Sequence, residues 1–84
     1  MKLPATITLA GKSITVRKSK RPLRGVWGYA KHENIVLSSD LPEDRALAIM
    51  IHEAMHLLFW FLSEETVDHA SKELAEALEI LDLA

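Results

Sequence analysis

The residues that most constrain this chain lie between positions 46 and 62, an apolar stretch interrupted by His52, Glu53 and His56. A helix that is apolar nearly all round is buried on most of its sides. Two histidines four residues apart fall on the same face of such a helix, so their ring nitrogens can converge on one metal ion. We therefore expect a helix over about residues 41–62 that presents a pair of metal ligands.

The glutamate that follows the first histidine completes the His-Glu-x-x-His pattern of zinc hydrolases. From that position the Glu53 carboxylate reaches a water on the metal rather than the metal itself, and can act as general base. With 4 histidines in 84 residues, chance placement gives roughly 0.02 matches to this pattern. The alternative, in which the three side chains bind nothing, is less favoured because burying polar groups without partners costs free energy.

Three features bear on where the protein acts. The stretch of residues 46–62 is near the lower length limit for crossing a bilayer, but three polar residues at its middle make a membrane span unfavourable. The chain has no cysteine, which fits a reducing cytoplasm and leaves His, Asp and Glu as the ligands for a metal. No apolar run of signal-peptide length follows the N-terminus. We expect a cytoplasmic protein with no membrane partner.

The first half of the chain predicts antiparallel β-strands. Residues 6–9 and 13–16 are β-branched, alternating runs around a glycine-containing turn, which is typical of a hairpin. Residues 25–30 and 34–38 have the pattern of two further strands joined by a polar turn. The expected fold class is α+β, as one domain over residues 1–84 with strands over about 5–38, a helix over about 41–62 and a second helix over about 64–82.

Both helices have recognisable starts. Residues 38–44 offer a serine or aspartate cap, a proline in the first turn and acidic side chains near the positive end of the helix dipole. The run from Ser63 to Thr66 predicts the start of the second helix. Its inward stripe is expected at spacings of three and four, on Val67, Ala70, Ser71, Leu74, Leu78 and Leu81.

A catalytic zinc ion needs a third protein ligand, and the candidates after the second histidine are Glu64, Glu65, Asp68 and His69. On the second helix, at about 100° per residue, only Glu64 borders the apolar stripe. Glu65 fits a solvated role near the positive end of the helix dipole. We therefore predict that Zn²⁺ is bound by His52, His56 and Glu64, with His69 as the alternative if the second helix is kinked or begins later.

The stretch from the Gly-Tyr strand through His52–His56 to the helix that opens with Glu64 resembles zinc metallopeptidases of the gluzincin kind. It is similar to ImmA/IrrE-type proteins and to small phage and prophage proteins with the same helix. The resemblance covers about residues 25–82 and implies a zincin-like fold and hydrolysis of a peptide or protein substrate. In such families the strand before the helix lies at the edge of the site and pairs with an extended peptide, which here would involve Asn34, Ile35, Val36, Leu37 and Ser38.

The charges divide the chain into a basic first half and an acidic second half. Eight of the 10 Lys and Arg lie within residues 1–31, and all 12 Asp and Glu lie from Glu33 onward. The basic half would suit nucleic acid or an acidic partner, although a solvated loop near an acidic helix explains it as well. The alternative to a peptidase is therefore a non-catalytic, metal-stabilised binding module for nucleic acid or a partner protein.

A peptidase also needs a donor that stabilises the oxyanion of its transition state, and the candidates are Tyr29, His32 and His69. The sequence does not rank these three. Trp27 and Tyr29 fall on the same face of their strand by the two-residue period, and we expect them to pack as an aromatic face.

Overall fold

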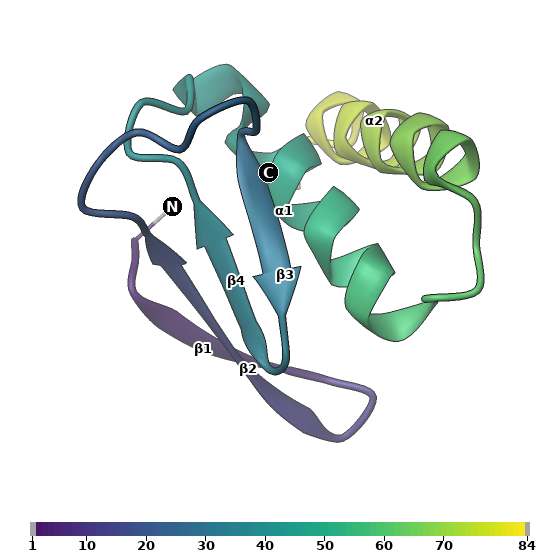
Figure 1. The fold of residues 1–84 in the computed structure, drawn as a ribbon. Coiled ribbons are helices and arrows are strands. Elements are labelled where there is room, and N and C mark those ends of the chain that lie inside the picture. Colours follow the sequence, from purple (N-terminus) through teal and green to yellow (C-terminus); the bar gives the residue numbers. More distant parts are fainter. Residues whose placement is uncertain (1, 84) are drawn as a thin grey trace.

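Four strands precede two helices in this structure, a computed structural model that describes residues 2–83. The elements are β1 (Ala5–Leu9), β2 (Lys12–Lys18), β3 (Gly28–Lys31), β4 (Asn34–Leu37), α1 (Glu43–Leu58) and α2 (Glu64–Ile80). Figure 1 shows α1 beside the sheet and α2 against the outer side of α1. The predicted α+β arrangement, strands first and then two helices, is confirmed.

The sheet has the strand order β1-β2-β4-β3. β1 and β2 form an antiparallel hairpin around Ala10 and Gly11, whose φ angles of 50° and 76° suit a tight two-residue turn. β3 and β4 form a second antiparallel hairpin, but β2 and β4 pair in parallel, so the sheet is mixed where antiparallel strands were expected. The connection over residues 19–27 causes this, because it carries the chain to the far edge before the second hairpin turns back. β3 is therefore an edge strand and β4 an inner one.

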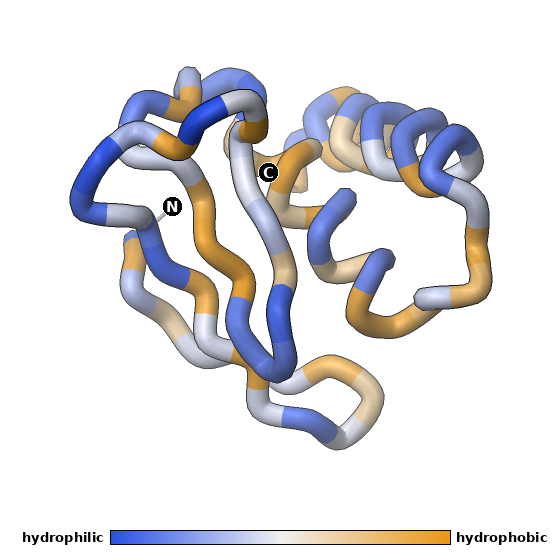
Figure 2. Tube along the Cα trace, in the orientation of Figure 1, coloured by the Kyte–Doolittle hydropathy of each residue, from blue (hydrophilic) through white to orange (hydrophobic). Residues whose placement is uncertain are grey.

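The core lies between one face of the sheet and α1. Its buried apolar side chains are Ile14, Val16, Ile35, Leu37, Leu41, Ala46 and Ala54. Figure 2 shows the apolar colour along β4 and on α1, whereas most of the β2–β3 loop and much of α2 are hydrophilic. Each large aliphatic side chain that is fully buried contributes about 1.5–3 kcal/mol to folding. The side chains of β4 thus hold it in the middle of the sheet.

α1 begins without the side-chain cap that the sequence predicted, so that prediction is wrong. The N-cap residue is Pro42, which offers no side-chain hydrogen bond to the first turn. Ser38 and Asp40 are engaged elsewhere: Ser38 Oγ accepts a hydrogen bond from Leu23 N–H at 2.9 Å and donates one to the Asp40 carboxylate. The Ser38 hydroxyl therefore binds the backbone of the β2–β3 loop and does not cap the helix.

α1 ends at Leu58, before the predicted end at residue 62. Phe59 leaves the helical conformation, with φ −126° and ψ 55°, although its N–H still donates to Met55 O at 2.7 Å. Phe59, Trp60 and Phe61 then form an exposed turn with edge-to-face ring contacts, which we name the aromatic turn. This turn reverses the chain and brings the start of α2 next to the end of α1.

α2 begins as predicted, with Ser63 as its N-cap. Ser63 Oγ accepts a hydrogen bond from Thr66 N–H at 3.1 Å and donates one to Thr66 Oγ1 at 2.8 Å. The helix ends at Ile80, before the predicted end at residue 82. Across residues 2–83, no helix is both long enough and apolar enough to cross a membrane.

The face that α2 turns toward α1 differs in part from the predicted stripe. Its buried residues are Val67, Ser71 and Ala75, one in every four. The prediction is wrong at Leu74 and Leu81, which are 50% and 64% exposed. The reason is that α2 packs on α1 along the row Val67, Ser71 and Ala75, in which every fourth residue lies in line. Leu74 lies in a neighbouring row and stays partly in solvent.

Candidate metal centre

The two histidines of the His-Glu-x-x-His pattern lie on one face of α1. Their Nε2 atoms face each other at 3.1 Å, and their rings meet edge to face at 73°. The His52 side chain is mostly buried and that of His56 is less so, with exposed fractions of 14% and 30%. The spacing of four has the effect expected from the sequence, because one helical turn brings both rings to the same point.

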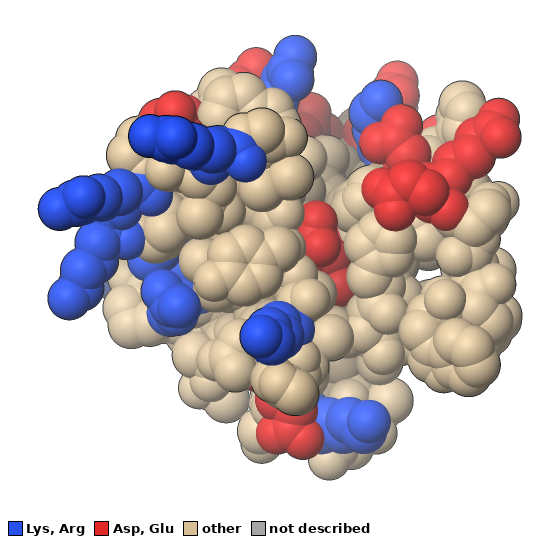
Figure 3. Space-filling view, viewed as in Figure 1, with Lys and Arg blue, Asp and Glu red and all other residues tan. Residues whose placement is uncertain are grey.

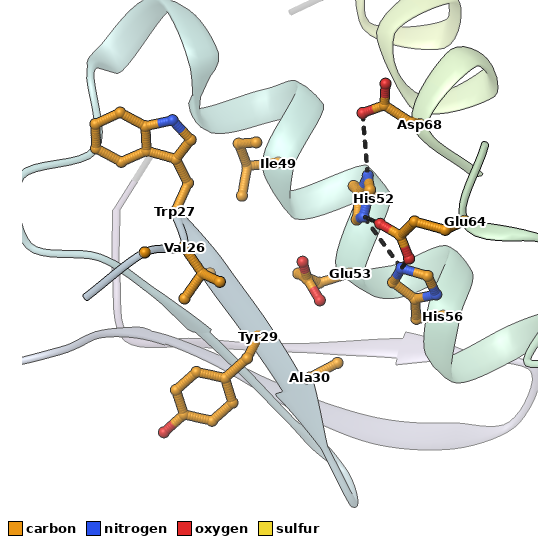
Figure 4. A pocket seen from close by; sticks show the side chains of 12 residues that line it. Val26, Trp27, Tyr29, Ala30, Ile49, His52, Glu53, His56, Glu64 and Asp68 are labelled. Carbon is orange, nitrogen blue, oxygen red and sulfur yellow. Dashed lines mark hydrogen bonds and ion pairs between the residues drawn. The ribbon is translucent and has the colours of Figure 1, made fainter. Parts of the chain in front are cut away.

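Glu64, the first residue of α2, reaches back to both histidines, as Figure 4 shows. Its Oε1 lies 2.9 Å from His52 Nε2, and its Oε2 lies 2.9 Å from His56 Nε2. The aromatic turn and the Ser63 cap determine this position, since together they set where α2 starts relative to the end of α1. The ligand atoms of the three residues all lie within 4.8 Å of one another.

The donor atoms of this group fit a metal ion better than they fit one another. If both Nε2 atoms carry a proton, each donates to the ionised Glu64 carboxylate, but the two N–H groups then face each other at 3.1 Å. If either Nε2 lacks a proton, its lone pair faces a carboxylate oxygen at 2.9 Å. A single cation instead accepts a lone pair from each residue. Tetrahedral ligands at about 2.0–2.1 Å from an ion lie about 3.3 Å apart, and one ligand atom from each of the three residues lies within 4.8 Å of the others. His52, His56 and Glu64 could therefore hold a metal ion.

Asp68 lies on the opposite side of the His52 ring. Its Oδ1 is 3.8 Å from His52 Nδ1, whereas Nε2 of that ring faces the ligand group. Lys72 donates a hydrogen bond to Asp68 Oδ2 at 3.0 Å, and this bond lowers the pKa of the Asp68 carboxyl below its usual value. Asp68 is thus an ionised neighbour of the ring and not a member of the ligand group. Within residues 2–83, Glu65 and His69 also lie outside that group.

Glu53 projects from α1 toward β3, next to the histidine pair (Figure 4). Burial raises the pKa of its carboxyl above the usual value; the two histidines oppose this shift and Glu64 adds to it. No residue between 2 and 83 donates a hydrogen bond to this carboxylate, which lines a cavity of about 480 Å³. Partial burial without a protein partner costs free energy. The carboxylate is therefore available to a water or a ligand in the cavity.

The cavity lies between β3 and the helices, and part of its wall is apolar. Val26, Trp27 and Ile49 contribute side chains to this wall (Figure 4). Gly28 brings the strand close to the helix: a Cβ there would lie 3.0 Å from Val36 O and 3.2 Å from Ile49 Cγ2. Absence of a side chain at this position thus allows β3 and α1 to enclose the cavity.

β4, the strand expected to bind a substrate, does not line this cavity. Its backbone pairs with β2 on one side and with β3 on the other, so neither edge is free for a peptide. The prediction that Asn34, Ile35, Val36, Leu37 and Ser38 lie at the edge of the site is therefore wrong, because local sequence does not reveal the order of strands in a sheet. Their role in binding a substrate has no support in this geometry. The free edge beside the cavity belongs to β3, which among the strands of residues 2–83 pairs with β4 alone.

His52, His56 and Glu64, which could hold a metal ion, are named here the metal-ligand group. The three expected oxyanion donors do not converge on this group. Figure 4 shows the Tyr29 hydroxyl pointing away from it. His32 is in the β3–β4 turn, with φ 57°, and lines a different hollow. His69 is exposed on α2. Trp27 and Tyr29, expected to pack as an aromatic face, are instead 37% and 40% exposed at the rim of the cavity.

The sequence reasoning missed the residues that shape the cavity. Ile49 precedes His52 by three residues and lies on the same helical face, so the helical period could have identified it. Val26 and Gly28 carry no such signal, because their place beside α1 depends on the order of strands. The position of Asp68 behind His52 depends on how α2 crosses α1, which no local pattern gives.

Comparison with known proteins found no matching family model, no matching curated protein and no matching solved structure. The resemblance to ImmA/IrrE-type peptidases therefore stays a prediction.

Proposed function

We propose that this protein is a zinc-dependent metallopeptidase in which His52, His56 and Glu64 bind the metal and Glu53 is the general base. The observation that carries the proposal is the opening of the three-ligand group onto the cavity that Glu53 also lines. Two imidazoles and one carboxylate are a ligand set that zinc takes at catalytic sites, where a fourth position stays open.

The chemistry of peptide hydrolysis assigns a role to each group. Bound zinc would supply a water of lowered pKa and polarise the carbonyl of the scissile bond. Glu53 accepts the proton that the attacking water loses and then donates it to the leaving amine. Burial raises the pKa of Glu53 in the metal-free chain, and a zinc ion beside this carboxyl would act in the opposite direction.

The substrate that we propose is an extended peptide paired with the free edge of β3. The N–H and C=O groups on the outer side of an edge strand are open to such pairing. A peptide bound there passes along the cavity in front of Glu53. Val26, Trp27 and Ile49 would contact an apolar side chain beside the scissile bond.

A purely structural metal site is the alternative, and two observations disfavour it. Structural zinc sites usually have four protein ligands and are closed, whereas this group has three within residues 2–83 and its Glu64 side chain is 72% exposed. A structural site also gives no reason for Glu53, whose half-buried carboxylate lies beside the ligands at a cost to folding. A general base accounts for that residue.

The test is hydrolysis of an unfolded protein such as casein by the zinc-loaded full chain. We expect one zinc ion per chain and measurable turnover. Glu53→Gln should keep the metal and lower kcat by roughly 10²–10⁴-fold, because Gln has the same shape but accepts no proton. His52→Ala and His56→Ala should lose both metal and activity. Zinc should also raise the thermal midpoint, since it binds the native state.

Two results would contradict the proposal. Equal loss of metal in all three variants would make Glu53 a ligand or a structural residue. Full zinc occupancy without hydrolysis of any unfolded protein would leave the non-catalytic binding module as the better account.

A further inference from the structure

We infer that the β2–β3 loop makes this cleft selective for peptides that carry acidic residues on the C-terminal side of the bond to be cleaved. The inference rests on the proposed function and adds a substrate class to it. Its basis is a group of cations, which we name the basic loop: Lys18, the last residue of β2, and Lys20, Arg21 and Arg24 in the connection that follows it.

The basic loop adjoins the cavity. Arg24 directly precedes residues 25–27, which line both the main cavity and a second hollow of about 220 Å³ that Leu23 and Asp40 complete. Residues 25–27 are thus a wall that the two hollows share, directly after Arg24. Figure 3 shows basic side chains gathered on the loop side of the molecule and acidic side chains gathered over α2, on the other side of the cleft.

The positive charges of the basic loop are exposed and have no internal partners. None of the four side chains forms an ion pair with another residue in the described range 2–83. The loop backbone, by contrast, is held: Ser19 N–H donates to Leu37 O at 2.8 Å, and Leu23 N–H donates to Ser38 Oγ at 2.9 Å. The loop therefore presents unused cations from a tethered backbone, which suits recognition of an acidic ligand.

The direction of β3 decides which end of a bound peptide meets the basic loop. β3 runs from Gly28, on the loop side, to Lys31, at the turn into β4 (Figure 1). An antiparallel peptide, which is the slightly more stable pairing, runs the opposite way. It passes the metal-ligand group first and then the basic loop. At about 3.3 Å per residue, side chains roughly two to five positions after the scissile bond reach the loop.

The free edge of β3 distinguishes such a peptide from nucleic acid. A peptide backbone can exchange N–H···O=C hydrogen bonds with that edge, whereas a nucleic-acid backbone has no matching row of N–H and C=O groups. The described lining of the cavity also includes no Lys or Arg, whereas a groove that follows a nucleic-acid strand is positive along its length. A peptide that is acidic only in its C-terminal part places its charges at the basic loop and leaves an uncharged segment in the cleft.

The test uses zinc-loaded Glu53→Gln protein, which should bind peptides without cleaving them, so that loss of hydrolysis and failure of this inference are separate results. Three peptides share an apolar centre. They differ in having a Glu pair after the centre, a Glu pair before it, or Gln in both places. We expect the first to bind about five- to tenfold more tightly than the others at low salt, with a preference that declines as salt is added.

Charge reversal in the basic loop supplies the second arm. Arg21→Glu combined with Arg24→Glu should abolish the preference for the Glu pair and favour a peptide with a Lys pair in its place. Both arginines are exposed, so the double variant should still fold. Lys12→Glu, the same charge change on the first hairpin, should leave the preference unchanged. Any of four results would overturn the inference: equal binding of the three peptides, tighter binding of the peptide with the upstream Glu pair, no binding of any peptide, or tighter binding of a single-stranded oligonucleotide.

Discussion

Asp68 Oδ1 lies 3.8 Å from Nδ1 of His52, the ring nitrogen that faces away from the metal-ligand group. A carboxylate in this place favours the tautomer with its proton on Nδ1, which leaves Nε2 free to bind a metal. The separation exceeds a hydrogen bond, so the attraction is electrostatic, and Lys72 shares the carboxylate. We therefore predict that Asp68 positions the His52 ring.

Asp68→Asn should weaken zinc binding by about three- to tenfold, because the missing charge no longer orients the His52 ring. Competition with a chromophoric chelator measures the affinity. Glu65→Gln removes the same charge from the first turn of α2, outside the ligand group, and should leave zinc affinity nearly unchanged. Equal losses in the two variants would mean that only the net charge of α2 matters.

Glu64→Ala should have a larger effect, lowering zinc affinity by about 10²-fold or more, which corresponds to about 2.7 kcal/mol. Glu65→Ala should cost no more than a few tenths of a kcal/mol of stability through the helix dipole. Isothermal titration of zinc into the two variants, side by side, decides the assignment. Release of the metal by Glu65→Ala or His69→Ala, with retention in Glu64→Ala, would show that the third ligand is another residue.

Without metal, the Glu53→Gln variant should be more stable than the wild-type chain at neutral pH. Burial raises the pKa of Glu53, so the native state keeps its proton to higher pH than the unfolded state. The stability of the wild-type chain therefore declines as pH rises from the usual value of 4.5 through the raised native value. The Glu53→Gln variant should therefore have the larger unfolding free energy above this pH window, and the difference should vanish below it.

Urea unfolding of both metal-free proteins at neutral and acidic pH measures that difference. A Glu53→Gln variant less stable than the wild-type chain at neutral pH would reveal a structural role for the carboxylate. It would also remove one of the two arguments against a purely structural metal site.

Gly28→Ala should destabilise the fold by about 1–3 kcal/mol, because the added Cβ would lie 3.0 Å from Val36 O and 3.2 Å from Ile49 Cγ2. Zinc affinity should change little, since the ligands come from α1 and α2. Tyr29→Phe, at the next and exposed position of β3, is the matched control for denaturant unfolding. An unfolding free energy equal to that of the control would mean that β3 moves away from α1 without cost.

Sequence patterns were sufficient where a single element decides the outcome. The spacing of His52 and His56 and the Ser63 cap are local features, and each has its expected geometry in the structure. Glu64 also meets the histidines as predicted, because the helical period puts it beside the inward row of α2 and the short connection starts α2 next to the end of α1.

The order of strands was beyond such patterns. Nothing local places the β3–β4 hairpin with β3 outermost, so the free edge beside the cavity was expected on the wrong strand. The continuous apolar run Ile35-Val36-Leu37 is typical of an inner strand and could have corrected the assignment. The predicted end of α1 was too late for a similar reason. The apolar residues of the aromatic turn were taken as part of the helix, but an apolar run does not show whether it is buried or exposed.

The edge of β3 has a consequence for solubility. An unpaired strand edge is a template for any extended chain, including a second copy of the same protein, and open edges are common starting points of aggregation. Here the edge is 4 residues long and ends in Lys31, and both shortness and a lysine oppose continued growth of a sheet between molecules. A longer or uncharged β3 would therefore favour fibrils, even though the rest of the fold had not changed.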